Sequence, residues 1–195
     1  MGELNSYCFK CGQTMRYSVP PDDDQERWNC AACGYVMYEN PTPIVLVAVE
    51  AAGRLLLIRR AQQPYKGRWA VPGGFVEKGE SVTVAAVREL EEEAGIQVAE
   101  DALIPLFISS VVSTNQIYIT FRTHLPELIP VKLGVEASEG NWFSREDFPR
   151  EEFWLPNLLS AVDDFFDCNE TGDFKLYVSD WSETTMHNRA FDFNV

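Results

Sequence analysis

The chain has 195 residues, of which 46% are hydrophobic, so it is long enough to bury the core of a domain of ordinary size. Its 30 acidic and 16 basic side chains give a formal net charge of −14, which argues against a protein that binds the phosphate backbone of a nucleic acid. A phosphorylated ligand must therefore be attracted by local groups. No stretch of the sequence is apolar for long enough to span a membrane, so we expect no membrane partner.

The first predicted element is a pair of matching cysteine motifs. Cys8 and Cys11 lie in one CxxCG sequence, Cys30 and Cys33 lie in a second, and 18 residues separate the two pairs. This spacing is typical of a zinc site with four cysteine ligands, and four thiolates leave no open position for a substrate. We therefore predict a small ribbon over residues 1–39 that is held together by a structural zinc ion.

Two other uses of these cysteines are considered. Two disulfides would need an oxidising compartment, but residues 1–6 lack the apolar run of a signal peptide, so we expect a cytoplasmic protein with reduced thiols. A redox site needs one CxxC motif and leaves the matched second copy unexplained. Residues 1–40 carry three basic and six acidic side chains, which argues against a nucleic acid partner for the ribbon.

A pair of strands is predicted directly after the ribbon. Residues 44–49 form a nearly continuous β-branched run typical of a buried strand, residues 51–54 form a turn, and residues 55–58 return. A loop over residues 59–73 follows. Arg59 and Arg60 lie at its start, where they are candidates for contact with phosphate, although two arginines at a strand end are commonly only solvated.

An acidic helix is predicted over residues 82–94. At helical spacing, Glu89, Glu92 and Glu93 fall within a sector of about 100°, where their like charges repel one another. A hard divalent cation such as Mg²⁺ prefers carboxylate oxygens and removes this repulsion. The three glutamates therefore predict a metal site on one face of the helix.

The ends and the opposite face of this helix also have sequence signals. Ser81 is suited to cap its start, and Gly95 is suited to a left-handed residue after its end. Before it, Gly73 and Gly74 predict a loop whose backbone can approach a ligand closely. The apolar stripe expected to pack on a sheet lies opposite the carboxylates and consists of Thr83, Val87, Leu90 and Ala94.

Residues 74–96 resemble the Nudix box, which is the signature of the Nudix hydrolases. The signature is Gly, five residues, Glu, seven residues, then Arg-Glu-apolar-x-Glu-Glu-x-Gly-apolar. It is matched at every specified position, by Gly74, Glu80, Arg88, Glu89, Leu90, Glu92, Glu93, Gly95 and Ile96. The resemblance implies a mixed-sheet α/β/α sandwich. It also implies an enzyme that hydrolyses a nucleoside diphosphate linked to another group with Mg²⁺ or Mn²⁺.

The resemblance implies a role for each charged residue of the box. Glu89, Glu92 and Glu93 are expected to hold the catalytic metal, and Glu89 or another carboxylate is expected to help deprotonate the attacking water. Arg88 is expected to orient these glutamates through charge-assisted hydrogen bonds. Glu80 is expected to brace the loop that precedes the helix.

Two further features of the expected site lie beside the helix or outside the box. Gly74 lets the backbone approach the metal or the phosphate, and its carbonyl group is a candidate ligand. Members of this family often use a further glutamate from a loop outside the box, for which Glu136 and Glu139 are the candidates. An ordinary surface loop is the alternative for both.

The remaining predicted elements complete the sandwich. Residues 103–112 and 116–125 predict paired strands, and Trp142 and Phe143 suggest a further short strand. Residues 151–166 have helical apolar spacing and predict a second amphipathic helix. The expected domains are the ribbon over 1–39, the Nudix domain over 40–168 and a C-terminal extension over 169–195. In the extension, residues 174–178 suggest one more strand, and the sequence leaves open whether the extension covers a dimer partner.

The choice of substrate depends on the combination of ribbon and box. This combination resembles NADH pyrophosphatases, but those carry a motif rich in proline and tryptophan after the box, which is absent here. The closer resemblance, over residues 7–149, is to FAD and ADP-ribose pyrophosphatases, which release AMP. An adenine or flavin ring needs an aromatic surface, and core packing is the alternative role for the candidates Tyr65, Trp69, Phe75 and Tyr118.

A non-catalytic regulator that senses a ligand or interacts with RNA is the alternative class of function on the same fold. Such a protein has no need of catalytic carboxylates, so the intact set Glu89, Glu92 and Glu93 favours an enzyme.

Overall fold

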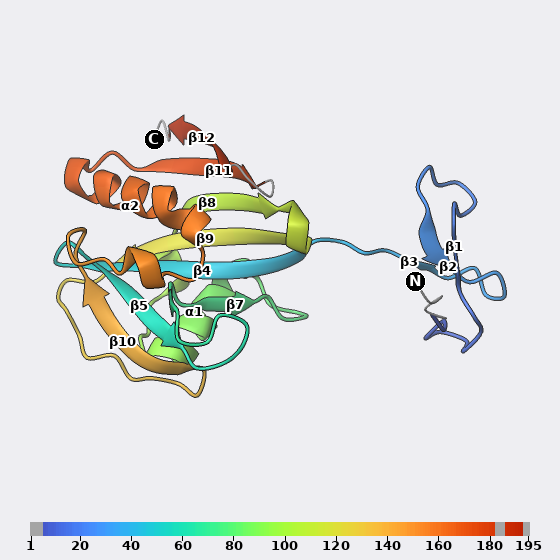
Figure 1. The fold of residues 1–195 in the computed structure, drawn as a ribbon, viewed down its shortest axis with the longest axis horizontal. Helices are drawn as coiled ribbons and strands as arrows, with labels where there is room; N and C mark the ends of the chain where they lie inside the picture. Colours follow the sequence, from blue (N-terminus) through green and yellow to red (C-terminus); the bar gives the residue numbers. More distant parts are fainter. Residues whose placement is uncertain (1–5, 182–185, 193–195) are drawn as a thin grey trace. The chain divides into compact units, whose positions relative to one another are not determined.

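The computed structural model of the protein describes residues 6–181 and 186–192. The chain divides into two compact units, Met1–Asn40 and Pro41–Val195 (Figure 1). Residues 1–5, which belong to the segment expected to lack a signal peptide, lie outside the described residues. Residues 182–185 and 193–195 of the expected extension also lie outside them.

The first unit is a small three-stranded antiparallel sheet. Its strands are β1 (Arg16–Ser18), β2 (Arg27–Asn29) and β3 (Val36–Met37), in the order β1-β2-β3. The buried residues at its centre are Cys8, Met15 and Cys30, against which Trp28, Tyr35 and Met37 pack. An apolar core of this size is too small to stabilise a fold alone, so two of the predicted zinc ligands lie where a metal is most needed.

The second unit is built on one large mixed sheet with two helices. Its strands are β4 (Thr42–Ala51), β5 (Arg54–Arg60), β6 (Trp69–Ala70), β7 (Gly73–Phe75), β8 (Ile104–Val111), β9 (Gln116–His124), β10 (Ala137–Phe143), β11 (Lys175–Trp181) and β12 (Met186–Asp192). The main order is β10-β5-β4-β9-β8-β11-β12, while β6 pairs with β5 and β7 pairs with β4. The pairs β4–β9 and β8–β11 are parallel.

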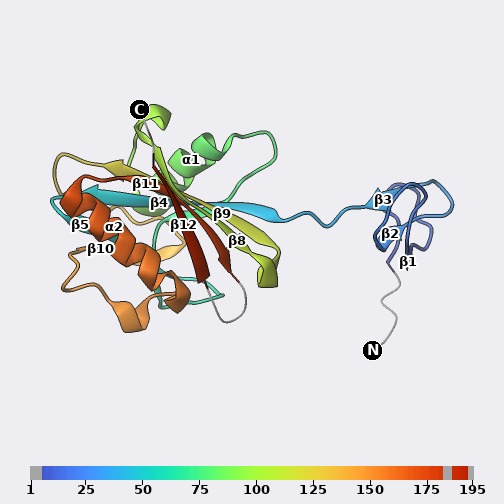
Figure 2. The same ribbon diagram turned by 90° about the horizontal axis from the view of Figure 1, so that it is seen from above.

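The two helices, α1 (Val82–Ala94) and α2 (Leu159–Thr171), cover opposite faces of the sheet (Figure 2). Alternation along β4 explains this arrangement, because successive side chains of a strand point to opposite faces. Val45, Val47 and Val49 pack with Leu90 of α1, whereas Ala48 packs with the apolar residues of α2. The predicted mixed-sheet α/β/α sandwich is therefore confirmed.

Most of the predicted strands are present. β4 and β5 form the predicted pair after the ribbon, and β8 and β9 are antiparallel and joined near Asn115, which has a left-handed conformation. The strand suggested for residues 174–178 is found as β11, which joins β12 to the large sheet. The expectation of a loop at Gly73 and Gly74 was wrong, because both residues belong to β7 and pair with β4.

Helix α1 begins and ends as predicted. The Ser81 side chain accepts a hydrogen bond from the Val84 N–H group, and Gly95 after the last turn has a φ of 66°. The predicted apolar stripe was only half right: Leu90 and Ala94 are buried, but Thr83 is not. The rest of the buried face consists of Ala85, Ala86 and Glu93. The acidic face therefore adjoins the sheet, and one of its glutamates packs under the helix.

Helix α2 begins later than predicted. The sequence pattern suggested a start near residue 151, whereas the helix begins at Leu159 after short 3₁₀ turns at Arg150–Glu152 and Pro156–Leu158. Pro156 explains the difference, because a residue that precedes proline is driven towards extended backbone. Leu155 is extended accordingly, with φ −126° and ψ 95°.

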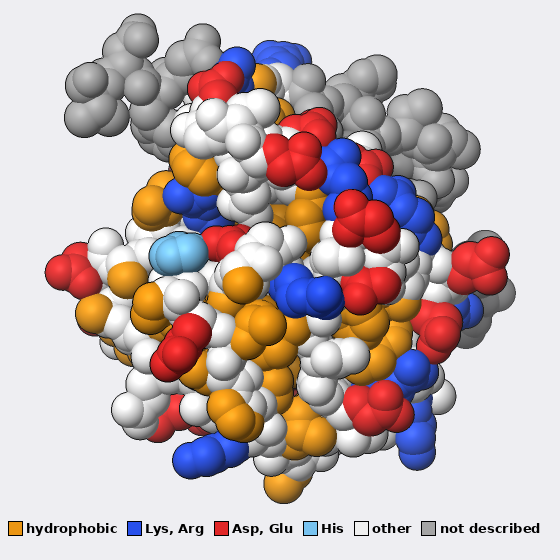
Figure 3. Space-filling view, turned by 90° about the vertical axis from the view of Figure 1, so that its left-hand side faces the viewer, with side chains coloured by type: hydrophobic (Ala, Val, Ile, Leu, Met, Phe, Trp, Pro, Cys, Tyr) orange, Lys and Arg blue, Asp and Glu red, His pale blue; other side chains and the backbone are white. Residues whose placement is uncertain are grey.

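Charged and hydrophobic side chains are distributed unevenly over the face of the larger unit that Figure 3 shows. Figure 3 shows one face of the larger unit, on which basic side chains lie among acidic ones and hydrophobic side chains gather in the lower half. Neither helix of the described chain has the length and apolar character needed for a membrane crossing.

Candidate functional site

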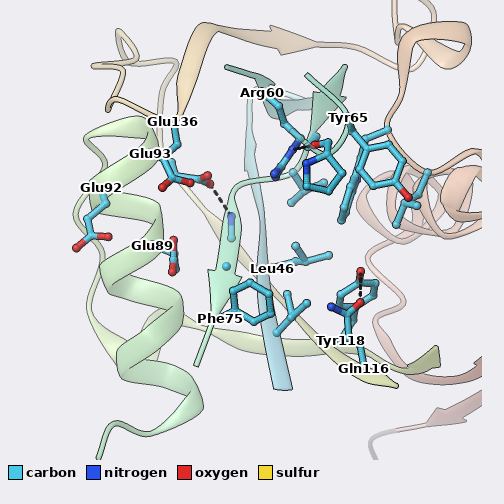
Figure 4. Close-up of a pocket in the computed structure, with 18 of the residues that line it drawn as sticks. Leu46, Arg60, Tyr65, Phe75, Glu89, Glu92, Glu93, Gln116, Tyr118 and Glu136 are labelled. Carbon is cyan, nitrogen blue, oxygen red and sulfur yellow. Dashed lines mark hydrogen bonds between the residues drawn. The ribbon is translucent and has the colours of Figure 1, made fainter. Parts of the chain in front are cut away.

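A large cavity of the second unit lies where β4 and β5 separate. These strands pair only next to their turn, at Glu50–Leu55 and Ala51–Arg54, and beyond it β7 takes the place beside β4. The resulting cavity has a volume of about 890 Å³. Its two ends differ in chemistry, with carboxylates of α1 on one side and aromatic side chains on the other (Figure 4).

The acidic end is formed by the predicted glutamates of α1. Glu89, Glu92 and Glu93 all line the cavity, together with Glu136 from the segment before β10. Their exposure differs across the face of the helix: Glu93 is 4% exposed, while the side chains of Glu89 and Glu92 are 14% and 61% exposed. The side of the acidic face at Glu93 is therefore screened from water, and the side at Glu92 is open to solvent.

Glu93 is a buried carboxylate with very few partners. One of its oxygens, Oε2, accepts a hydrogen bond of 2.8 Å from the Gly73 N–H group. Burial raises the pKa of Glu93 to about 7, and the charges of Glu89 and Glu136 act in the same direction. Since a buried carboxylate is stabilised by a neighbouring cation, this group fits a divalent metal ion better than it fits the protein alone.

Arg88 connects the loop before the helix to the acidic face. Its guanidinium group donates two hydrogen bonds to Glu80, of 3.1 and 2.8 Å, and one of 2.8 Å to Glu89. Arg88 also donates to Glu92 at 3.3 Å and to the Phe75 carbonyl oxygen at 3.0 Å. These bonds lower the pKa of Glu80, whereas burial raises the pKa of Glu89 although Arg88 opposes that shift. Arg88 thus holds three carboxylates in place and has little capacity left for a ligand.

Two glycines allow the backbone to lie against the acidic helix. A Cβ atom added at Gly74 would lie 2.4 Å from Glu89 Oε1, so this position leaves no space for a side chain. A Cβ atom at Gly134 would lie 1.9 Å from the backbone oxygen of Glu92. The Gly134 N–H group donates to the Glu93 carbonyl oxygen at 3.2 Å. This close packing carries the segment that bears Glu136 to the cavity.

We expect the Gly74→Ala substitution to reduce activity more than stability. The added methyl group must displace the Glu89 carboxylate, which is the flexible end of a side chain, while the backbone of Gly74 has no positive φ to preserve. A displacement of about 1 Å at a reacting group lowers turnover by on the order of 10²-fold. Steady-state kinetics and thermal unfolding of the same preparation check this. Unchanged turnover, or a fall in Tm of more than about 4 °C, would contradict the expectation.

The other end of the cavity is aromatic. Trp154 contacts Tyr65 edge-on with ring centroids 5.7 Å apart, and its centroid lies 6.2 Å from that of Tyr118. The Tyr118 hydroxyl group donates to Gln116 Oε1 at 3.2 Å. Arg60 lines the cavity between the two ends, with its guanidinium carbon 5.8 Å from the Trp154 ring centroid. Tyr65, Tyr118 and Phe75 of the predicted aromatic surface are thus brought to the cavity.

Four residues predicted for the site do not line this cavity: Arg59, Trp69, Glu80 and Glu139. Arg59 lies over the Trp69 ring at 4.6 Å and forms ion pairs with Glu139 at 3.3 Å and Glu152 at 2.9 Å. Trp69 is 5% exposed and packs in the core beneath α2. Alternation along β5 explains the difference, because Arg60 points to the face opposite Arg59. Of the two arginines considered for contact with phosphate, Arg60 lines the cavity and Arg59 does not. Trp154 also lines the cavity, and it has no local sequence signal.

The four cysteines of the first unit converge on one point. Their sulfur atoms all lie within 4.8 Å of one another, with Cys8–Cys33 at 3.6 Å and Cys11–Cys30 at 3.5 Å. A tetrahedral zinc ion with Zn–S bonds of about 2.3 Å separates its ligands by ~3.8 Å, so the sulfur positions fit zinc. All four thiols are free. Among the described residues they are the only group of potential metal ligands gathered this closely.

The zinc knuckles also have the expected backbone turns. The N–H groups of Gly12 and Gly34 donate to the carbonyl oxygens of Cys8 and Cys30, and both glycines have a positive φ, of 75° and 71°. Backbone N–H groups of Cys33 and Ala32 lower the pKa of Cys30 to about 7. A thiol of lowered pKa is readily converted to the thiolate that zinc binds.

Comparison with known proteins gives two family matches and several relatives. The NUDIX domain family matches residues 40–162, and the Nudix N-terminal zinc ribbon family matches residues 6–39. An ADP-ribose pyrophosphatase of Methanocaldococcus jannaschii is 33% identical over 61% of this chain and 71% of its own length. The NAD-capped RNA hydrolase NudC of Pseudomonas aeruginosa is 29% identical over 74% of this chain, but this match spans only 50% of the NudC protein.

A solved structure agrees with these matches. The crystal structure of a NUDIX hydrolase from Nitrosomonas europaea has 27% identity and a TM-score of 0.79, and the match covers 90% of this chain and 99% of that protein. The matched families cover both the acidic helix and the four-cysteine ribbon. The chain therefore belongs to the Nudix family, and its first unit is the N-terminal zinc ribbon found in that family.

Proposed function

We propose that this protein hydrolyses the diphosphate bond of a nucleoside diphosphate linked to another group. The observation that carries this proposal is the cavity in which Glu89, Glu92 and Glu93 lie opposite an arginine and an aromatic surface. Glu136 from the neighbouring loop is the fourth carboxylate at the same end. In such a cavity the carboxylates can bind metal ions, while the arginine and the aromatic rings can bind a nucleotide.

In this proposal each group of the acidic end has a distinct task. Glu89, Glu92 and Glu93 hold Mg²⁺ or Mn²⁺, with the Gly74 carbonyl group as a further candidate ligand. When bound, the metal neutralises phosphate charge and makes a coordinated water more acidic. Arg88 keeps Glu89 and Glu92 oriented through its hydrogen bonds, and Glu80 anchors Arg88. Glu136 is positioned to accept a proton from water, and Glu139 pairs with Arg59 outside the cavity.

FAD or ADP-ribose is the proposed substrate, with AMP as one product. The relative from M. jannaschii named an ADP-ribose pyrophosphatase supports ADP-ribose. NADH is the second candidate. The relatives named NAD-capped RNA hydrolase NudC support a ligand that contains NAD, although this chain lacks the motif rich in proline and tryptophan. A non-catalytic sensor is less well supported because the four carboxylates are all present in the cavity.

The proposal is tested by incubating the purified full chain with FAD, ADP-ribose, NADH and diadenosine polyphosphates in parallel. We expect AMP from FAD or ADP-ribose with Mg²⁺ or Mn²⁺, and none after chelation of the metal. The metal supplies most of the charge stabilisation, so its removal should lower the rate by on the order of 10³-fold or more. Turnover that does not need metal would contradict the mechanism, and preference for NADH would favour the second candidate.

We also propose a reducing, cytoplasmic location, which is supported by the four free thiols at the zinc site. The presence of a homodimer is a separate question, which size-exclusion chromatography with light scattering would answer.

A further inference from the structure

Two arginines, Arg60 and Arg88, line the cavity, and they differ in their partners. Arg60 is half-buried, and its Nε donates to the Pro64 carbonyl oxygen at 3.0 Å. Among the described residues Arg60 forms no ion pair, whereas Arg54, Arg59, Arg88, Arg145 and Arg150 all pair with carboxylates. A guanidinium group with unused donors inside a cavity fits the two oxygens of a phosphate.

The electrostatic influence of Arg60 reaches both ends of the cavity. Burial raises the pKa of Glu93 and of Tyr118, and the positive charge of Arg60 opposes both shifts. Figure 4 shows Arg60 across the cavity from Glu93, near Tyr65. Along the cavity, the acidic face comes first, Arg60 follows, and the aromatic rings lie at the far end.

The aromatic end is shaped by a residue from a distant part of the chain. The Trp154 N–H group donates to the Trp69 carbonyl oxygen at 2.9 Å, which fixes the backbone of Trp154 beside β6. From this position its ring contacts both Tyr65 and Tyr118. The Trp154 Nε1 atom is buried and has no hydrogen-bond partner among the described residues, so a ligand ring that enters this cluster breaks no hydrogen bond of the indole.

We propose that Tyr65, Tyr118 and Trp154 bind the planar base of the substrate, while Arg60 binds the phosphate nearer to that base. This inference rests on the proposed function and deepens it. The ring, the sugar and the two phosphates then follow the order of rings, cation and acidic face along the cavity. Gln116 lies at the edge of the ring site, where its carbonyl oxygen already accepts from Tyr118 and Thr114. Its amide N–H₂ group is the polar contact for the edge of the base.

The arrangement predicts which half of the substrate determines affinity. The ring site is lined by apolar side chains, including Leu46, Val71 and Leu155, whereas the acidic end opens towards solvent at Glu92. The base therefore lies against apolar side chains, and the group on the other side of the diphosphate lies towards the acidic end. Compounds that share the base and the first phosphate should bind similarly even when their second groups differ.

The test measures binding of AMP and of ribose 5-phosphate to the full chain by calorimetry with Mg²⁺ present. We expect Trp154→Ala and Tyr65→Ala to weaken AMP binding by about 5- to 100-fold, because stacking on an aromatic ring has that effect when the ring is removed. Ribose 5-phosphate binding should change by less than about twofold. Trp154→Phe should keep most of the AMP affinity, and Arg60→Ala should weaken AMP binding by about tenfold or more. Phe9→Ala, an exposed aromatic residue of the ribbon, is the matched control.

Tyr65→Ala is included because it is less prone than Trp154→Ala to disturb folding. Tyr65 is 45% exposed, so its removal leaves the core intact. Unchanged AMP affinity in both Tyr65→Ala and Trp154→Ala would overturn the inference, as would equal weakening of AMP and ribose 5-phosphate. The binding measurement does not depend on turnover, so it tests the ring site independently of the proposed hydrolytic function. Absence of hydrolysis would count against the proposed function alone, whereas normal hydrolysis with an unaltered AMP affinity would count against the ring site alone.

Discussion

The Glu93→Gln variant is expected to lose diphosphate hydrolysis by on the order of 10³-fold while its fold becomes no less stable. Glu93 is the most deeply buried carboxylate of the cavity, and its one hydrogen bond comes from the Gly73 N–H group at 2.8 Å. A glutamine keeps an acceptor for this bond but cannot supply the charge that a divalent ion needs. Because burial already disfavours the ionised carboxylate, the neutral amide should raise the Tm of the metal-free protein or leave it unchanged.

Glu91→Gln is the matched control for this variant. Glu91 lies in the same helix two residues earlier, is exposed, and pairs with Gln97 outside the main cavity. Steady-state kinetics with Mg²⁺ and thermal unfolding without it should be recorded for both variants. Full activity in Glu93→Gln would rule out the role of Glu93 in binding the metal. An equal loss of activity in Glu91→Gln would show that the loss comes from the change in net charge and not from the cavity.

The Cys30→Ser variant is expected to lose its zinc and to unfold the ribbon. Cys30 is one of two buried ligands at the centre of the first unit, whose apolar core contains few residues. Structural zinc sites contribute an apparent ~10–16 kcal/mol of folding free energy in small domains, so loss of one ligand removes most of the stabilisation. Elemental analysis should fall from one zinc per chain to nearly none. Backbone amide signals of residues 6–39 should collapse in an NMR spectrum, while those of the larger unit remain dispersed.

The fifth cysteine provides the control for zinc binding. Cys168 is buried in the second unit, with its sulfur 3.6 Å from the Tyr177 hydroxyl oxygen, which offers a serine a hydrogen-bond partner. Cys168→Ser should keep one zinc per chain. A zinc content that stays at one in Cys30→Ser, with an intact ribbon, would contradict the four-cysteine site.

The parts of the site that were predictable are those formed by residues close together in sequence. Glu89, Glu92 and Glu93 share a face because helical geometry places them there, and the caps at Ser81 and Gly95 follow from local backbone chemistry. The four cysteines were predictable for the same reason, since zinc limits the spacing within each knuckle. In each case short-range covalent geometry decides the arrangement.

The parts that were missed depend on contacts between distant segments. Trp154 reaches the cavity only because its backbone joins β6, and no local pattern distinguishes it from a core tryptophan. The buried face of α1 was misread because a rule based on apolar residues places Glu93 in solvent, whereas the structure buries it beside Gly73. Arg59 and Arg60 were both candidates for contact with phosphate. Because neighbouring side chains of β5 point to opposite faces, only one of them can reach the cavity, and the pairing of β5 with its neighbours makes it Arg60.

The most direct test of the account is hydrolysis of ADP-ribose by the purified full chain in ¹⁸O-labelled water with Mg²⁺ or Mn²⁺. Cleavage of the diphosphate bond by an activated water predicts AMP and ribose 5-phosphate, with the label in a phosphate oxygen of one product and no reaction after chelation. FAD should give AMP and FMN with the same labelling if it is the substrate. Failure to cleave either compound or NADH with either metal, or release of a free base with the diphosphate intact, would contradict the account.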